Sequence, residues 1–281
     1  MKILLLAAAA LAGRAETPAI DDIMRRVALN QAKSQELRTN YVYHQQQLLR
    51  MIRGNKKVAR EERREYTISP KFRGNDRQLV KFAGRYESKG QYFTFDKPGY
   101  QYKGVDIDGG LMNDLADSMM HDNNGRDGIS SDLFPLTYHR QLKYDFKIVK
   151  AGEFRGAKAY LVHFEPKAKP KIGDMENGGV WRGDAWIDAE EYQPLQVATS
   201  LAWKMPLLVK TMLGTDFRGV GFTVTYQKFA DGVWFPVTYG GEFDIRAVFF
   251  YKRTMTINMV NSDFRRTDVT SNIEYEVAEG K

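Results

Sequence analysis

Cysteine is absent from the 281 residues of this chain. Its absence excludes a disulfide framework, thiolate metal sites, a cysteine nucleophile and a cysteine that carries an acyl anchor. Proline is scarce, with nine residues, and no long polar linker divides the chain. Hydrophobic residues make up 43% of the chain and aromatic residues 12%, which excludes disorder of the whole chain. We therefore expect one folded unit with a sizeable core.

The familiar catalytic signatures are also missing. The sequence contains no H-E-x-x-H metal motif, no G-x-S-x-G nucleophile turn and no G-x-x-x-x-G-K phosphate loop. The four histidines lie far apart and lack ligand-like spacing, so we expect them on strands or at the surface. They are His44, His121, His139 and His163. We predict that the chain is not an enzyme and holds no metal ion and no cofactor.

The one long apolar run lies at the N-terminus. Residues 3–12 are apolar, Lys2 precedes them and small residues follow, which is the layout of a secretory signal peptide. A membrane-spanning helix needs about 20 such residues, so a permanent anchor is the weaker interpretation. We expect cleavage after Ala12 or Ala15, with residues 1–15 as the signal peptide and 16–281 as a single domain. Without a cysteine to acylate, the exported chain is predicted to be free in the periplasm.

The balance of charge is basic, with a formal net charge of +7. In an exported protein this points away from nucleic acid and toward anionic lipid headgroups, cell-wall polymers or acidic partners, although it also aids solubility. Charged side chains are dense over residues 50–65. We predict that they lie on the solvated face of a hairpin, where each ion pair contributes little. The alternative is a docking surface for an anionic membrane or an acidic partner.

The N-terminal half begins with a helix and continues with strands. Thr17 is a candidate N-cap and Pro18 a candidate first helical residue, and apolar side chains recur at helical spacing, so we predict a helix over residues 18–37. Residues 41–53 and 58–69 are predicted to form a long hairpin. Further strands are predicted over residues 78–86, 91–95, 144–150, 158–165, 180–188 and 195–203.

The strand pattern stops between about residues 105 and 135. Leu111, Leu115 and Met119 fall there at helical spacing, with Met112 beside them. A helical insertion in a β protein is the simplest interpretation of this segment.

The last third carries the clearest strand signal. Residues 222–227 alternate strictly, Asp231-Gly232 reads as a two-residue type I′ turn, and residues 233–239 alternate on the return. The odd positions of residues 245–259 are mainly apolar, which predicts one long strand. We therefore predict a mainly β (α+β) fold: ten or eleven antiparallel strands in one strongly curved sheet, an unclosed β-barrel with an N-terminal helix and a helical insertion.

Aromatic and methionine side chains are abundant on the alternating strands. They can fill the core of a sandwich. Alternatively, a single curved sheet presents them to a helical lid and forms a pocket for acyl chains, to which flexible methionine is well suited. Both interpretations remain open at the level of sequence.

Three segments carry a resemblance to a known family. Residues 183–197 (GDAWIDAEEYQPLQV) place a glycine before a strand, an acidic turn and a second strand. Residues 154–164 (FRGAKAYLVHF) resemble the strand before this hairpin, and residues 232–236 (GVWFP) resemble the strand after the later turn. Over most of residues 16–270 the chain resembles the outer-membrane lipoprotein-sorting proteins of the LolA-like superfamily.

This resemblance implies an unclosed β-barrel with a helical lid, a hydrophobic cavity, and shuttling or sensing of lipidated molecules between membranes. In the best-known carriers of the family an arginine on an early strand closes the lid; no arginine of this chain is assigned that role from the sequence. The implied partners are a lipidated protein or a lipid, with an anionic membrane surface or an envelope membrane protein as further candidates.

We therefore predict a non-enzymatic periplasmic carrier or sensor of acyl-chain ligands, with outer-membrane lipoprotein sorting as the candidate role. Lid contacts are predicted from Leu111, Leu115 and Met119. The predicted cavity wall consists of Trp186, Phe222, Val224, Phe235, Phe249, Tyr251 and Met255. The alternatives are an outer-membrane β-barrel, an envelope structural protein, and an enzyme without a recognisable motif.

Overall fold

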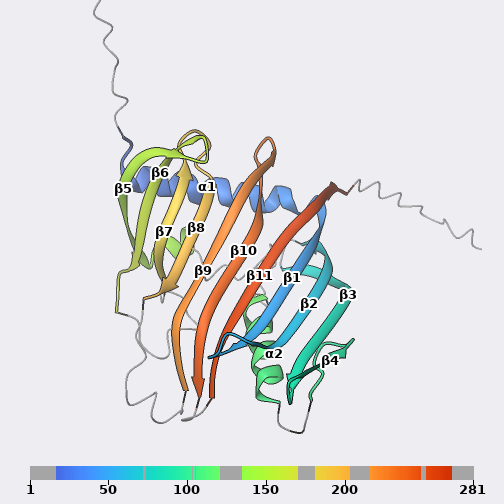
Figure 1. Ribbon diagram of the computed structural model, residues 1–281. Coiled ribbons are helices and arrows are strands. Elements are labelled where there is room, and N and C mark those ends of the chain that lie inside the picture. The colour runs from blue at the N-terminus through green and yellow to red at the C-terminus, as the bar shows by residue number, and fades with distance from the viewer. Residues whose placement is uncertain are drawn as a thin grey trace, which may run out of the picture.

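The computed structural model describes residues 17–71, 74–102, 104, 106–120, 135–169, 181–202, 215–247 and 251–267. These residues form one sheet and three helices (Figure 1). The elements are α1 (Ile20–Arg38), β1 (Tyr41–Arg53), β2 (Val58–Pro70), β3 (Asn75–Ser88), β4 (Gln91–Phe95), α2 (Ile107–Met120), α3 (Tyr138–Gln141), β5 (Tyr144–Phe154), β6 (Ala157–Pro166), β7 (Trp181–Asp188), β8 (Pro194–Leu201), β9 (Thr215–Ala230), β10 (Val233–Ala247) and β11 (Tyr251–Arg266).

The eleven strands form a single antiparallel sheet in the order β4-β3-β2-β1-β11-β10-β9-β8-β7-β6-β5. The two halves of the chain join where the first strand pairs with the last, for example at Met51 opposite Met255. Strands β4 and β5 are the two edges and do not pair with each other, so the sheet is not closed. The predicted mainly β, unclosed antiparallel architecture is confirmed.

The position of α2 follows from this strand order. Because β4 and β5 lie at opposite edges, the chain that connects them has to cross one face of the sheet. Helix α2 lies on this crossing and contacts β1 and β2, whereas the short α3 contacts α1 and β5. The predicted helical insertion is confirmed over Ile107–Met120; residues 121–134 lie outside the described part of the chain.

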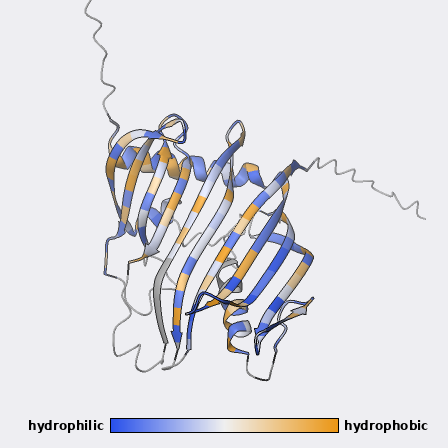
Figure 2. Cartoon of the chain, in the orientation of Figure 1, coloured by the Kyte–Doolittle hydropathy of each residue, from blue (hydrophilic) through white to orange (hydrophobic). Residues whose placement is uncertain are grey.

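The helices pack on one face of the sheet, which we call the inner face. Figure 1 shows α1 crossing behind the strands near one end of the sheet and α2 beside β1 and β2. The alternation of apolar and polar residues along the strands, visible in Figure 2, leaves apolar side chains on this face. They form a main cluster of Ile23, Met24, Val27, Leu49, Met51, Ala59, Met112, Leu136, Tyr144, Val162, Phe164, Trp181, Ala185, Ile187, Val197, Phe222, Val224, Tyr239, Phe243, Ile245, Tyr251, Met255, Ile257 and Met259.

A second, smaller cluster consists of Tyr43, Ile68, Val233 and Phe235. A row of buried amides, which we call the amide band, follows Tyr43 along β1 and continues on β11. Gln47 donates to Gln45 at 2.7 Å, Gln45 donates to Asn261 at 3.0 Å, and Asn261 donates to the carbonyl oxygen of Pro236 at 2.8 Å. The amide band is therefore one narrow polar strip beside the apolar part of the inner face, and the buried charged residues of β2 form another.

Helix α1 is held on the sheet by buried polar contacts as well as by its apolar face. Ser34 exchanges two hydrogen bonds of 3.0 Å with the backbone of Trp234, whose carbonyl oxygen also accepts from Arg38 at 2.8 Å. The predicted helix is confirmed, but its start was wrong: the helix begins at Ile20 and Ala19 is the N-cap, so Pro18 precedes the first turn. None of the helices among the described residues is both long and apolar enough to cross a membrane.

Two further predictions about the last third were wrong. Residues 245–259 are not one strand, because β10 ends at Ala247 and β11 begins at Tyr251, opposite it in the sheet. Both strands have their apolar residues at odd positions. The alternation in the sequence therefore continues from one strand to the next and does not show where β10 ends. In the turn before Val233 only Gly232 has a positive φ, of 73°, whereas a type I′ turn requires positive φ at both central residues.

We expect Ser34→Ala to destabilise the protein by about 1–3 kcal/mol, because the buried backbone N–H of Trp234 loses its acceptor. The free energy of unfolding in urea measures this effect. Ser262→Ala is the control, since its hydroxyl donates only to the neighbouring exposed Asp263 among the described contacts. An equal stability of the two variants would contradict the proposed anchoring of α1.

Candidate functional site

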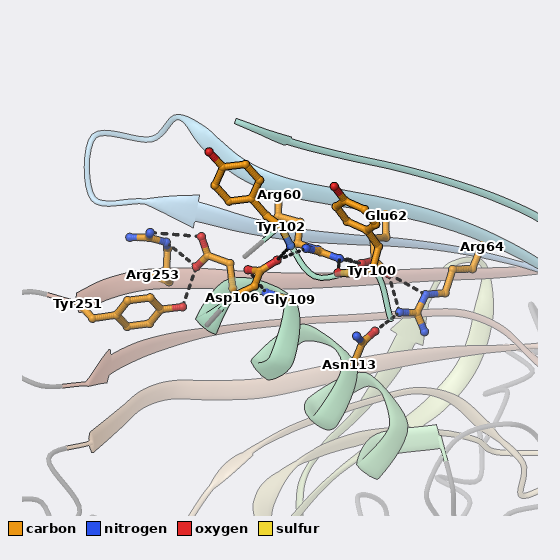
Figure 3. A network of polar contacts seen from close by, with 11 residues as sticks. Arg60, Glu62, Arg64, Tyr100, Tyr102, Asp106, Gly109, Asn113, Tyr251 and Arg253 are labelled. Carbon is orange, nitrogen blue, oxygen red and sulfur yellow. Dashed lines mark hydrogen bonds and ion pairs between the residues drawn. The ribbon is translucent and has the colours of Figure 1, made fainter. Parts of the chain in front are cut away.

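Helix α2 covers part of the inner face and is fastened to it by a polar network (Figure 3). Met112 is fully buried in the main cluster, and Leu111 packs against that cluster. The other attachments are polar and come from Asp106, Asp108 and Asn113. The candidate site is this helix together with the apolar surface and the charged residues beneath it.

The sheet side of the network is a ladder of charges on β2. Arg60, Glu62 and Arg64 alternate along the strand and therefore share the inner face. They are 1%, 0% and 4% exposed. The carboxylate of Glu62 accepts from Arg60 Nε at 3.0 Å and from Arg64 Nη2 at 2.5 Å. The sequence-based prediction that the charges of residues 50–65 are solvated was wrong for all three residues, and also for Glu61, which is 4% exposed.

Asp106 connects this ladder to the start of α2. Its carboxylate accepts from Arg60 Nη1 at 2.7 Å and from the backbone N–H of Gly109 at 2.9 Å, so it both pairs with the sheet and caps the helix. Gly109 leaves room for this contact, since a Cβ atom there would lie 2.7 Å from Arg60 Nη1. Arg60 Nη2 also donates to the carbonyl oxygen of Tyr100 at 2.7 Å, and its guanidinium lies 4.5 Å from the centre of the Phe95 ring.

Asp108 makes the second attachment, to the opening of β11. It accepts from Tyr251 Oη at 2.7 Å and from Arg253 Nε at 2.8 Å. Burial, reinforced by the charge of Asp108, raises the pKa of Tyr251 far above its ordinary value, so its hydroxyl stays protonated and donates. Asp108 lies in the first turn of α2, where a carboxylate also interacts favourably with the helix dipole.

Asn113 makes the third attachment by accepting from Arg64 Nη2 at 2.7 Å. Burial alone would lower the pKa of Arg64, but its ion pair with Glu62 outweighs burial and raises the pKa. The network contains three guanidinium groups and three carboxylates, so its formal charge is zero. Burial of charges requires such pairing, because an isolated buried charge is very costly.

Charges on the opposite face of β2 form a separate group. The Glu61 side chain is 5% exposed and pairs with Arg50 at 2.7 Å and with Arg63 and Arg85 at 3.3 Å each. Burial would raise the pKa of Glu61, but the hydrogen bond from Arg50 and the neighbouring arginines lower it. Among the described residues no group of three or more His, Asp or Glu side chains could hold a metal ion.

The structure brings some of the predicted site residues together. Phe222, Val224, Tyr251 and Met255 all belong to the main cluster, and Leu111 packs against it. Leu115 and Met119 belong to α2, but their side chains lie outside the described part, as does Phe249.

Two predicted wall residues lie elsewhere. Phe235 belongs to the second cluster, where its ring centre is 4.4 Å from that of Phe264. Trp186 lies between Ala185 and Ile187, which face the main cluster, so it projects from the opposite face of β7. There its ring stacks on Phe154 at 4.7 Å.

The charged part of the site was missed from the sequence. The available signal is the spacing of Arg60, Glu62 and Arg64, which alternate with Glu61 and Arg63 and so must divide between two faces. Pairing with β1 places Glu62 opposite Leu49, a core residue, and this pairing distinguishes the inner face of β2 from the opposite one.

Comparisons with known proteins give fold-level similarity only. No family model matches the chain, and no curated protein matches it. A solved outer membrane lipoprotein-sorting protein domain from Vibrio parahaemolyticus, itself described as putative, is 13% identical, with 90% of this chain and 94% of that chain covered and a TM-score of 0.41. A LolA superfamily protein from Nitrosomonas europaea is 10% identical, with 90% and 96% covered and a TM-score of 0.36. A DUF1329 family protein from Desulfovibrio piger is 11% identical, with 90% and 95% covered and a TM-score of 0.38.

We expect Glu62→Gln to destabilise the protein by about 3–5 kcal/mol, because the buried guanidinium of Arg64 loses its only carboxylate partner among the described contacts. Urea unfolding monitored by circular dichroism measures the change. Glu65→Gln is the matched control: its side chain is 30% exposed, and we expect a loss of less than about 1 kcal/mol. Equal losses would show that the ladder behaves like a surface ion pair.

Proposed function

We propose that this chain is an exported, non-enzymatic binding protein that holds the acyl chain of a lipid or lipoprotein between its inner face and α2. The observation that carries the proposal is the way α2 is fastened. A helix that covers an apolar surface is attached through Asp106, Asp108 and Asn113, which bind charged side chains of the sheet. A helix attached to the sheet through such polar contacts is suited to open and close over the apolar surface.

The surface beneath α2 supports an apolar ligand. In the described part of the chain no second sheet packs against the inner face, which is covered by helices alone. Leu49 and Met51 of β1, a strand that α2 contacts, and Met255 opposite Met51 are fully buried on this face. An acyl chain that replaces the contacts of α2 there would gain roughly 25 cal/mol for each Å² of apolar surface removed from water. Methionine adapts its shape to chains of irregular conformation.

The polar network allows the lid to open without leaving charged groups unpaired in an apolar environment. On opening, the sheet keeps three arginines and Glu62, a net charge of +2, while α2 keeps Asp106 and Asp108, a net charge of −2. Water solvates both sets once they separate, and Glu62 still pairs with its two arginines. Their mutual attraction draws the open lid back, and salt weakens this attraction.

The proposed setting of this function is the periplasm, and the support for it is the N-terminal apolar run of residues 3–12, which has the layout of a secretory signal peptide. A lipid or a lipidated protein is the proposed cargo, and a membrane surface or an envelope membrane protein is the proposed source or acceptor of the cargo. Outer-membrane lipoprotein sorting is the most specific role consistent with such a cargo.

We expect the exported protein, purified without detergent, to carry lipid that native mass spectrometry detects and organic extraction identifies. Met255→Gln, which places an amide in the main cluster, should reduce the carried lipid at least several-fold. Trp186→Gln is the matched control, because Trp186 projects from the opposite face, and it should carry as much lipid as the natural protein.

Three results would contradict the proposal. The first is a native protein that carries no lipid and whose melting temperature is unchanged by lipid extracts. The second is unchanged lipid in folded Met255→Gln. The third is loss of lipid in Trp186→Gln alone, which would place the ligand on the opposite face of the sheet.

We expect a covalently closed lid to slow ligand exchange by at least an order of magnitude. The chain contains no cysteine, so Asp108→Cys combined with Arg253→Cys introduces the only two thiols, at positions whose side chains pair in the structure. A short bifunctional thiol reagent joins them. The control is the same variant without the reagent, which should exchange a fluorescent fatty acid at least as fast as the natural protein. Equal rates with and without the cross-link would exclude α2 as the lid.

A further inference from the structure

Tyr239 holds an unusual hydroxyl within the apolar inner face. The residue is 3% exposed on β10, and its ring stacks on Phe222 with centres 5.6 Å apart and planes 20° apart. Its neighbours across the strands are Val224 and Met259. Its Oη atom is buried and has no hydrogen-bond partner among the described residues.

An unpaired hydroxyl at such a position calls for a physical reason. Buried polar groups in native proteins nearly always have a partner, because an unpaired one loses its hydration without compensation. Tyr251, a tyrosine of the neighbouring strand that belongs to the same cluster, does have a partner and donates to Asp108. Phenylalanine would fill the position of Tyr239 with the same ring and without the unpaired group.

The surroundings of Tyr239 change character along the strand. On one side the inner face of β10 continues to Phe243 and Ile245, both members of the main cluster, over about 20 Å at roughly 3.4 Å per residue. On the other side lies the amide band. Gln47 stands opposite Met259, which in turn stands opposite Tyr239, and Asn261 donates to the carbonyl oxygen of Pro236. Tyr239 therefore lies at the border between the apolar surface and the polar strip.

That border is where the carbonyl group of an acyl ligand belongs, since the hydrocarbon chain requires the apolar side and the remainder of the ligand is polar. Burial raises the pKa of Tyr239 well above its ordinary value, so the hydroxyl remains a neutral donor. A neutral ester or amide carbonyl fits this donor better than a carboxylate, because a buried carboxylate would also need a cation beside it.

We propose that Tyr239 Oη donates a hydrogen bond to the acyl carbonyl of the bound ligand, so that Tyr239 selects acyl esters and amides over hydrocarbon or ether-linked chains of equal length. This inference rests on the proposed function, since it places the ligand on the same inner face. Beyond that function, it specifies acyl esters and amides as the class of ligand and Tyr239 as the residue that selects them.

The test is a competition between two lipids that differ only in the carbonyl groups: dipalmitoyl phosphatidylcholine and its dihexadecyl ether analogue, offered as equimolar mixed vesicles. Native mass spectrometry of the full exported chain reads the ratio of the two complexes directly. We expect the natural protein to favour the ester lipid by about 3- to 10-fold, the effect of one neutral hydrogen bond. Tyr239→Phe should bind both lipids equally.

Two further measurements keep the test specific. Because the hydroxyl has no partner among the residues that the structure describes, the melting temperature of lipid-free Tyr239→Phe should equal or exceed that of the natural protein. Tyr41→Phe is the matched control: it removes the same atom from a ring that packs on Phe235 in the second cluster, and it should keep the preference for the ester lipid.

The outcomes separate the two proposals. If the natural protein binds both lipids and Tyr239→Phe keeps the ester preference, or if Tyr41→Phe loses it equally, the role of Tyr239 is excluded while acyl binding stands. A lower melting temperature of lipid-free Tyr239→Phe would show that the hydroxyl has a partner in the protein, which also excludes the role. If the natural protein binds neither lipid, the proposed function fails and this inference fails with it.

Discussion

The balanced set of charges between β2, α2 and β11 is the constraint on which the arrangement of the inner face depends. Arg60 and Glu62 are almost fully buried, and charges at such positions are tolerated only with partners of opposite sign. Without α2, the charged residues of β2 and β11 in this set would carry an excess of positive charge. Asp106 and Asp108 remove that excess only when α2 lies where the structure places it. Electrostatics thus specifies the position of the helix, whereas apolar contact would allow it to slide.

The strand order makes this pairing possible. The chain leaves the sheet at one edge, β4, and re-enters it at the other, β5, so the connection has to cross a face. The crossing brings the first turn of α2 beside the ends of β2 and β11, which are far from it in sequence. The same crossing lays α2 over an apolar surface that no second sheet covers among the described strands. The position of α2 and the apolar surface beneath it are therefore two consequences of one topology.

Local patterns predicted much of the fold. Helical spacing located α1 and α2, and alternation located the hairpin of β1 and β2. Alternation failed where it continued through a connection, between Ala247 and Tyr251, because a reversal of direction need not change the parity of the apolar positions. It also could not distinguish Trp186 from Phe222, since both occupy regular strands and only the packing of neighbours shows which face is covered.

The sequence by itself determined the mainly β composition, the position of most elements and the supply of apolar side chains, because these depend on periodicity and on residues close along the chain. Only the tertiary structure decided which charges are buried, which face α2 covers and which buried hydroxyl has no partner among the described residues. The reason is that both the burial of Glu62 and the lack of a described partner for Tyr239 Oη depend on neighbouring residues. These neighbours lie on other strands and on a helix that are distant in sequence. Local sequence does not encode the identity of those neighbours.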